Sequence, residues 1–125
     1  MTEIIDGSRS DTLSQVIVKG MQEKKGEEIT VLDLRGIKNA VADFFVICTG
    51  NSDTHVDAIS DSVEAFVHKE FKENPWHREG SQNKEWVLLD YVNVVVHVFK
   101  RESREHYGIE HLWGDAETTY IAEAS

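Results

Sequence analysis

The chain has 125 residues, the size of one compact domain, and its 40% hydrophobic content is typical of globular rather than disordered proteins. Thirteen basic residues against twenty-three acidic ones give a net charge of −10, which disfavours sequence-specific nucleic-acid binding and favours a basic protein as partner. The single cysteine excludes an intrachain disulfide, and no apolar run approaches the length that spans a bilayer. We therefore expect a cytoplasmic protein without membrane contact.

The first half of the chain predicts a lead-in, one helix and two strands. Residues 1–10 are acidic and polar and predict a flexible lead-in. Apolar side chains recur at helical spacing over residues 11–25, with Ser10 or the residue after it as the cap. Residues 29–34 predict a strand. Residues 43–49 are apolar on both faces, which is typical of a central strand covered on both sides.

A turn over residues 50–53 leads into the second predicted helix. Ser52 or the aspartate after it is placed to cap this helix. The helix must end before Pro75, because the residue preceding a proline is disfavoured in helical geometry. We expect a short additional strand near Trp76 in the polar segment that follows.

Two strands and a helical segment are predicted in the last third of the chain. Residues 86–90 and 94–99 are rich in β-branched and aromatic side chains, and their short connection predicts a hairpin. Residues 101–111 have helical character that is interrupted at Gly108. The pattern predicts an α/β (α+β) fold, with a mixed β-sheet flanked by helices.

The predicted organisation is a single domain over residues 11–116. It is preceded by the lead-in of residues 1–10 and followed by a C-terminal tail of residues 117–125.

Residues with the chemistry of a metal or catalytic site show no matching pattern. The six histidines form no metal-binding spacing and Cys48 has no second cysteine beside it, so we expect neither a metal nor a cofactor. Cys48 lies in the most apolar strand, where a thiol acts as inert core. His97 has two interpretations: a buried, hydrogen-bonded histidine or a residue of an interface.

A strand, the Gly50-Asn51-Ser52 turn and a helix N-terminus form a layout that can bind an anion. Asp53 and Asp57 would repel an anion there, and no closely spaced carboxylate pair follows to hold magnesium. A helix cap is the preferred interpretation of this turn, and an anion site remains the alternative.

Aromatic residues gather around the C-terminal hairpin and helix: Trp86, Tyr91, Phe99, Tyr107 and Trp113. Aromatic side chains rimmed by charge are typical anchors of protein–protein interfaces, although each one alone fits a core position. The nearby basic residues Lys100, Arg101 and Arg104 alternate with glutamates and predict an ion-paired, solvated helix face.

The stretch EWVLLDYVNVVVHVF, residues 85–99, resembles the signature of the ribosomal silencing factor family, also called RsfS or Iojap. The resemblance extends to ADFFVI (42–47), TGNS (49–52) and LWGDA (112–116), and includes Arg104. One departure is Val92, where the family commonly has glycine.

The resemblance implies a nucleotidyltransferase-like domain without catalytic residues, and hence a binding protein rather than an enzyme. It implies binding to the large ribosomal subunit through ribosomal protein number fourteen. There the domain would sterically block joining of the small subunit and repress translation, while mitochondrial relatives assist large-subunit assembly. It also implies that a homodimer can form.

We hypothesise that the interface has an apolar centre with Asp90 pairing a basic residue of the partner. That centre would consist of Trp86, Tyr91, His97, Phe99 and Tyr107, and the resemblance adds Arg104 and Trp113. Two alternatives remain: a nucleotidyltransferase-like protein that binds phosphate or nucleotide at the turn of residues 50–53, and a module whose aromatic surface serves only its own dimer.

Overall fold

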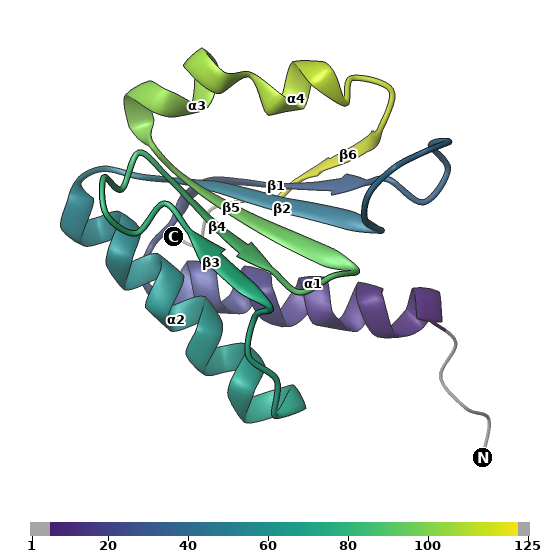
Figure 1. The fold of residues 1–125 in the computed structure, drawn as a ribbon, viewed down its shortest axis with the longest axis horizontal. Helices are drawn as coiled ribbons and strands as arrows, with labels where there is room; N and C mark the ends of the chain where they lie inside the picture. Colours follow the sequence, from purple (N-terminus) through teal and green to yellow (C-terminus); the bar gives the residue numbers. More distant parts are fainter. Residues whose placement is uncertain (1–5, 123–125) are drawn as a thin grey trace.

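The computed structural model describes residues 6–122, which form one six-stranded sheet with helices on both faces (Figure 1). The strands lie in the order β3-β4-β5-β2-β1-β6. The elements, in chain order, are α1 (Asp6–Glu23), β1 (Glu27–Asp33), β2 (Phe44–Gly50), α2 (Asp53–Phe71), β3 (His77–Glu79), β4 (Trp86–Asp90), β5 (Val94–Lys100), α3 (Arg101–Tyr107), α4 (Ile109–Leu112) and β6 (Glu117–Tyr120).

The sheet is mixed, as predicted. β2 and β5 pair in parallel, and the other neighbouring strands pair antiparallel. All seven residues of β2 are buried, which confirms the prediction of a central strand covered on both sides. The hairpin of β4 and β5, the short strand after Trp76 and the break at Gly108 are also confirmed.

Both ends of the chain differ from the prediction. The first helix begins at Asp6, so residues 6–10 belong to it rather than to a lead-in, and residues 1–5 lie outside the described part. Ser10 does not act as its cap; instead its hydroxyl donates to Asp43 at 2.7 Å. Residues 117–120, predicted as tail, form β6 on the free edge of β1. All four are exposed, so their sequence carries no alternating apolar pattern that would predict a strand.

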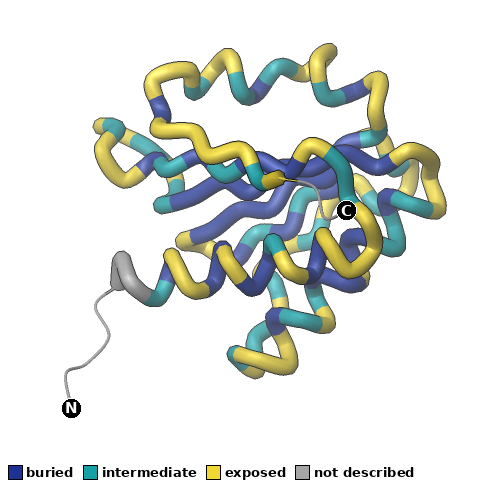
Figure 2. Tube along the Cα trace, turned by 180° about the vertical axis from the view of Figure 1, so that it is seen from behind, coloured by how far each residue is buried: buried dark blue, intermediate teal, exposed yellow. Residues whose placement is uncertain are grey.

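Two apolar clusters lie on opposite faces of the sheet. The larger cluster lies under α1 and α2 and includes Ile17, Met21, Val46, Val56, Ile59, Val63, Val87, Leu89 and Tyr91. The smaller cluster lies on the side of α3 and α4 and consists of Leu32, Leu34, Phe45, Ile47, Val95, Phe99, Ile109 and Ala116. Figure 2 shows the inner strands as the buried layer, with exposed residues concentrated on the outer sides of the helices.

The connection between β4 and β5 is a tight turn around Val92. The amide of Asn93 donates to the carbonyl of Tyr91 at 2.9 Å, and the φ angle of Val92 is 75°, which together define a γ-turn. A β-branched side chain is strained at this φ, whereas glycine adopts it freely. The turn therefore forms despite the strained valine at its centre. The Asp90 carboxylate supports the turn by accepting from the Val92 amide at 2.7 Å.

Candidate functional site

Strand β4 has one closed face and one accessible face. Val87 and Leu89 point toward α2 and are fully buried. Trp86, Leu88 and Asp90 alternate with them and are only partly buried. The strand was predicted as a hairpin strand with aromatic content, and its alternation now places three residues together on the side of α3 and α4.

The surface around Trp86 and Leu88 carries an acidic rim. Strand pairing places Glu79 of β3 directly opposite Leu88, and Glu79 is exposed. Glu85 is also exposed, and its carboxylate lies at 3.5 Å from the hydroxyl of the half-exposed Tyr107. We define the open face as Trp86, Leu88 and Tyr107 together with the acidic residues Glu79, Glu85 and Asp90.

A continuous series of rings supports the open face from below. Trp86 stacks on Phe99 with ring centroids 5.0 Å apart, and Tyr107 lies 4.8 Å from Trp86. The series continues from Trp86 to His97 at 5.8 Å and from His97 to Phe45 at 4.5 Å. Trp113 contacts Phe45 edge-on at 5.9 Å, at the far end of the series. The structure therefore joins Trp86, His97, Phe99 and Tyr107 directly and Trp113 through Phe45, and all of these except Phe45 are predicted site residues.

His97 is buried and holds Trp86 by a hydrogen bond. The indole Nε1–H of Trp86 donates to His97 Nδ1 at 3.0 Å. Burial lowers the pKa of His97 to about 3, so the imidazole is neutral. Because Nδ1 accepts, the ring proton of the neutral imidazole resides on Nε2. The interpretation of His97 as a buried, hydrogen-bonded histidine is confirmed, and its role in an interface stays a prediction.

Besides the buried His97, two further predicted members of the apolar centre are not available at the surface. Tyr91 follows β4 on the opposite side of the sheet, in the cluster under α1 and α2, and is 6% exposed. A one-residue offset along a strand reverses the face, so Tyr91 cannot share a surface with Trp86. Phe99 is on the correct side but fully buried, so it supports Trp86 instead of contacting a partner. The hypothesis of one five-residue apolar centre is corrected accordingly.

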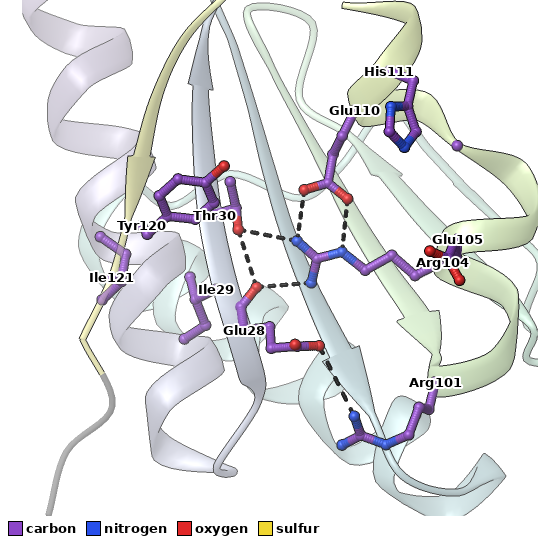
Figure 3. Close-up of a pocket in the computed structure, with 11 residues that line it drawn as sticks. Glu28, Ile29, Thr30, Arg101, Arg104, Glu105, Glu110, His111, Tyr120 and Ile121 are labelled. Carbon is purple, nitrogen blue, oxygen red and sulfur yellow. Dashed lines mark hydrogen bonds and ion pairs between the residues drawn. The ribbon is translucent and has the colours of Figure 1, made fainter. Parts of the chain in front are cut away.

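All N–H groups of Arg104 donate within the chain, and Figure 3 shows its bonds to Glu28, Thr30 and Glu110. Arg104 lines a cavity of about 580 Å³, and its Nε and Nη2 donate to the two carboxylate oxygens of Glu110 at 2.8 and 2.9 Å. The remaining donors bind the Glu28 carbonyl at 2.7 Å and the hydroxyls of Thr30 and Thr49 at 3.0 Å each. A guanidinium has five N–H groups, and all five are used here.

Arg104 therefore ties α3 and α4 to β1 and β2 and has no donor left for a partner. The same hydrogen bonds lower the pKa of Glu110 and keep its carboxylate ionised. We assign Arg104 a structural role in place of the predicted contact with a partner.

The turn at Gly50, Asn51 and Ser52 is built as a helix cap. The Ser52 hydroxyl accepts from the His55 amide at 3.1 Å, and the Asn51 amide donates to His55 Nδ1 at 2.9 Å. A Cβ at Gly50 would lie 2.8 Å from a Val56 methyl, so this glycine allows the helix to approach β2. These contacts confirm the predicted cap and account for the glycine without an anion.

Charges around this turn are paired within the chain. Lys100 donates to Asp53 at 2.7 Å, and Arg101 forms an ion pair with Glu27. The basic residues are ion-paired, but the prediction of a solvated helix face with local partners is wrong. The partners come from α2, β1 and α4, and the Arg104 side chain is only 12% exposed.

The single cysteine, Cys48, is buried in the core. Burial raises the pKa of the Cys48 thiol to about 12, as expected of an inert core cysteine.

Among residues 6–122 no group of three or more histidine, cysteine or acidic side chains could hold a metal ion. No helix in that range is long and apolar enough to cross a membrane.

Sequence reasoning missed Leu88, Glu79 and Phe45. Leu88 had a usable signal, because in a strand it shares its face with Trp86 and Asp90, two residues away on either side. Glu79 and Phe45 had none, since their neighbours are set by strand pairing and ring packing across the fold.

The chain is similar to several known proteins. The sequence model of the family described as "Ribosomal silencing factor during starvation" matches residues 8–125. A protein of Halalkalibacterium halodurans named "Ribosomal silencing factor RsfS" is 41% identical over 87% of this chain and 92% of its own. A crystal structure of a protein from Chromobacterium violaceum superposes with a TM-score of 0.78 at 29% identity, covering 92% of this chain and 94% of that one. A mouse protein named "Mitochondrial assembly of ribosomal large subunit protein 1" is 27% identical over 78% of this chain and 43% of its own length.

Proposed function

The chain belongs to the ribosomal silencing factor family, and from that premise we propose that it represses translation by occupying the large ribosomal subunit. In this proposal the domain binds a basic protein of the large subunit, ribosomal protein number fourteen, and sterically prevents the small subunit from joining. It acts in the cytoplasm as a binding protein without turnover. The mouse relative, named for large-subunit assembly, supports the choice of subunit.

The observation that carries the proposal is the open face. Trp86 and Leu88 remain partly exposed on a strand whose other face is fully buried. A stacked tryptophan held by a hydrogen bond is a rigid apolar anchor, and tryptophan is enriched among the residues that dominate binding energy. The fold keeps apolar surface here that it buries on the opposite side.

Charge favours a basic protein over ribosomal RNA. The net charge of −10 repels phosphate, whereas Glu79, Glu85 and Asp90 surround the apolar centre with carboxylates. One carboxylate oxygen of Asp90 accepts from the Val92 amide, which leaves the other to meet a basic side chain of the partner. A homodimer through the same face would compete with the ribosome for it.

Co-sedimentation with purified ribosomal subunits tests the proposal. The protein should pellet with large subunits, should not pellet with small ones, and should lower the yield of joined ribosomes when both are mixed. Binding should weaken as salt rises, because the acidic rim contributes by long-range attraction. If the protein pellets with neither subunit, the proposal is wrong.

Trp86→Ala should weaken binding to the large subunit about 30-fold, or about 2 kcal/mol, because it removes the anchor. Trp76→Ala is the matched control, since Trp76 is 75% exposed and lies in a separate hollow with Tyr91 and Val92. Both variants are first checked for an intact fold by circular dichroism. Equal affinity of the two variants would remove Trp86 from the interface.

A further inference from the structure

We propose that His97 is a positioning residue whose Nδ1 lone pair fixes the Trp86 indole in the orientation that the partner meets. The inference rests on the proposed function and deepens it, because it assigns a role to a residue that the partner itself does not reach. His97 is 3% exposed, so it acts through Trp86.

The chemistry of the two rings defines the contact. An indole N–H can only donate, so the 3.0 Å contact requires a lone pair on His97 Nδ1. The strands place the two residues as diagonal neighbours: Trp86 pairs with Phe99, and His97 lies two residues before Phe99 on β5. The hydrogen bond thus fixes Trp86 from the side while Phe99 supports its ring from below.

The other ring nitrogen shows what the histidine contributes. His97 Nε2 is buried and has no hydrogen-bond partner within the described part of the chain. A buried polar atom without a partner destabilises the fold, and an apolar residue would fill the same space without that cost. The surrounding residues Phe45, Ile47 and Phe99 are apolar and would accommodate such a residue. The acceptor that His97 offers to Trp86 is the one benefit that an apolar side chain could not supply.

Fixing Trp86 in advance should improve affinity. An indole on a partly exposed strand face can adopt several rotamers, and ordering it during association reduces affinity about fivefold to tenfold. The hydrogen bond to His97 and the contact with Tyr107 at 4.8 Å restrict these rotamers before the partner arrives.

Two substitutions at His97 separate positioning from packing. His97→Phe keeps a ring of similar size and removes the acceptor, and we expect a fold at least as stable as the wild type but about tenfold weaker binding to large subunits. His97→Asn places an amide oxygen near the position of Nδ1, and we expect lower stability but binding within about twofold of the wild type. A purely structural role predicts the opposite order, with affinity following stability, and that order would overturn the proposal.

Nuclear magnetic resonance tests the contact without relying on variants that must fold. In the wild type, the hydrogen bond should give a measurable scalar coupling between the Trp86 Nε1 and His97 Nδ1 nitrogens, and a slowly exchanging indole proton. The signal is assigned with Trp86→Phe, since Trp76 and Trp113 also contribute indole resonances. Absence of the coupling overturns the positioning role whatever the variants do.

The experiments distinguish failure of the proposed function from failure of the positioning role of His97. If the wild type does not bind large subunits, the proposed function fails together with the role of His97 in binding, even where the coupling is present. If the wild type binds and His97→Phe binds equally well, only the positioning role fails. Weak binding by His97→Phe, rescue by His97→Asn and the observed coupling together support it.

Discussion

The two faces of the sheet differ in how completely their side chains are buried. Under α1 and α2, most of the inward side chains are completely buried. Where the two helices meet, the hydroxyl of the buried Ser62 donates to the Gly20 carbonyl at 2.8 Å. On the side of α3 and α4, Trp86 and Leu88 stay partly exposed above a buried histidine. Burial of apolar surface is the main stabilising contribution to folding, so the closed face should dominate stability.

Under the proposed function, this difference separates folding from binding along single strands. On β4, Val87 and Leu89 contribute to the core while Trp86 and Leu88 form the open face. A substitution on one face should therefore change mainly stability or mainly binding.

The largest effect is expected on the closed face. Ile59→Ala removes a fully buried side chain from α2 and should lower the free energy of unfolding by about 3 kcal/mol, through lost burial and the cavity that remains. Chemical denaturation measures the change. The folded fraction should still bind large subunits with wild-type affinity.

Leu112→Ala is the control for Ile59→Ala, because Leu112 on α4 is 76% exposed. It should change stability by less than about 0.5 kcal/mol. Loss of subunit binding by fully folded Ile59→Ala would show that the two faces are not independent.

Acidic pH should weaken the side of the sheet that contains His97. Its pKa is about 3 in the folded chain and near 6.5 when unfolded, so the unfolded state binds more protons between these values. This contribution to stability is complete above about pH 6.5 and is lost as pH falls toward 3. Between pH 7 and pH 5 the loss should be about 2 kcal/mol.

Denaturation curves at several pH values measure this loss, and His97→Phe provides the comparison. The variant should lose about 2 kcal/mol less over the same pH interval, because its side chain does not titrate. Parallel curves for the two proteins would show that His97 does not carry the pH dependence. Measurements above pH 5 avoid the range in which most carboxylates titrate.

The smallest effect is expected at a turn that belongs to neither face. Val92→Gly should raise the free energy of unfolding by about 1 kcal/mol, because glycine adopts the φ of 75° without strain. Val92→Ala retains a Cβ and should give a smaller gain. Thermal unfolding measures both, and subunit binding should not change. A loss of stability in Val92→Gly would mean that the half-exposed valine side chain contributes more than the strain costs.

Several elements of the fold could be predicted because their signals are local. The apolar run of β2, the cap at Ser52 and the break at Gly108 depend on residues within one turn or strand, and the structure confirms each. Strand β6 could not be predicted, since its exposed residues have no apolar alternation and it forms only by pairing with β1.

In the candidate site, too, features set by neighbouring residues could be predicted, and contacts between distant elements could not. The sequence indicated the aromatic residues as a group, and most of them do form one series of rings. Strand alternation already separates Tyr91, five residues after Trp86, from the face of Trp86, and the structure places it under α1 and α2. The sequence could not show that all five donors of Arg104 are used, since the acceptors lie on β1, β2 and α4.

The sequence by itself determined the family, the mixed sheet and the aromatic hairpin, because periodicity and a long continuous signature are properties of neighbouring residues. Only the tertiary structure decided that Trp86 is anchored by His97 while Tyr91 and Phe99 are enclosed. The physical reason is that strand register sets which side chains meet across the sheet, and register is fixed by packing and pairing over the whole domain.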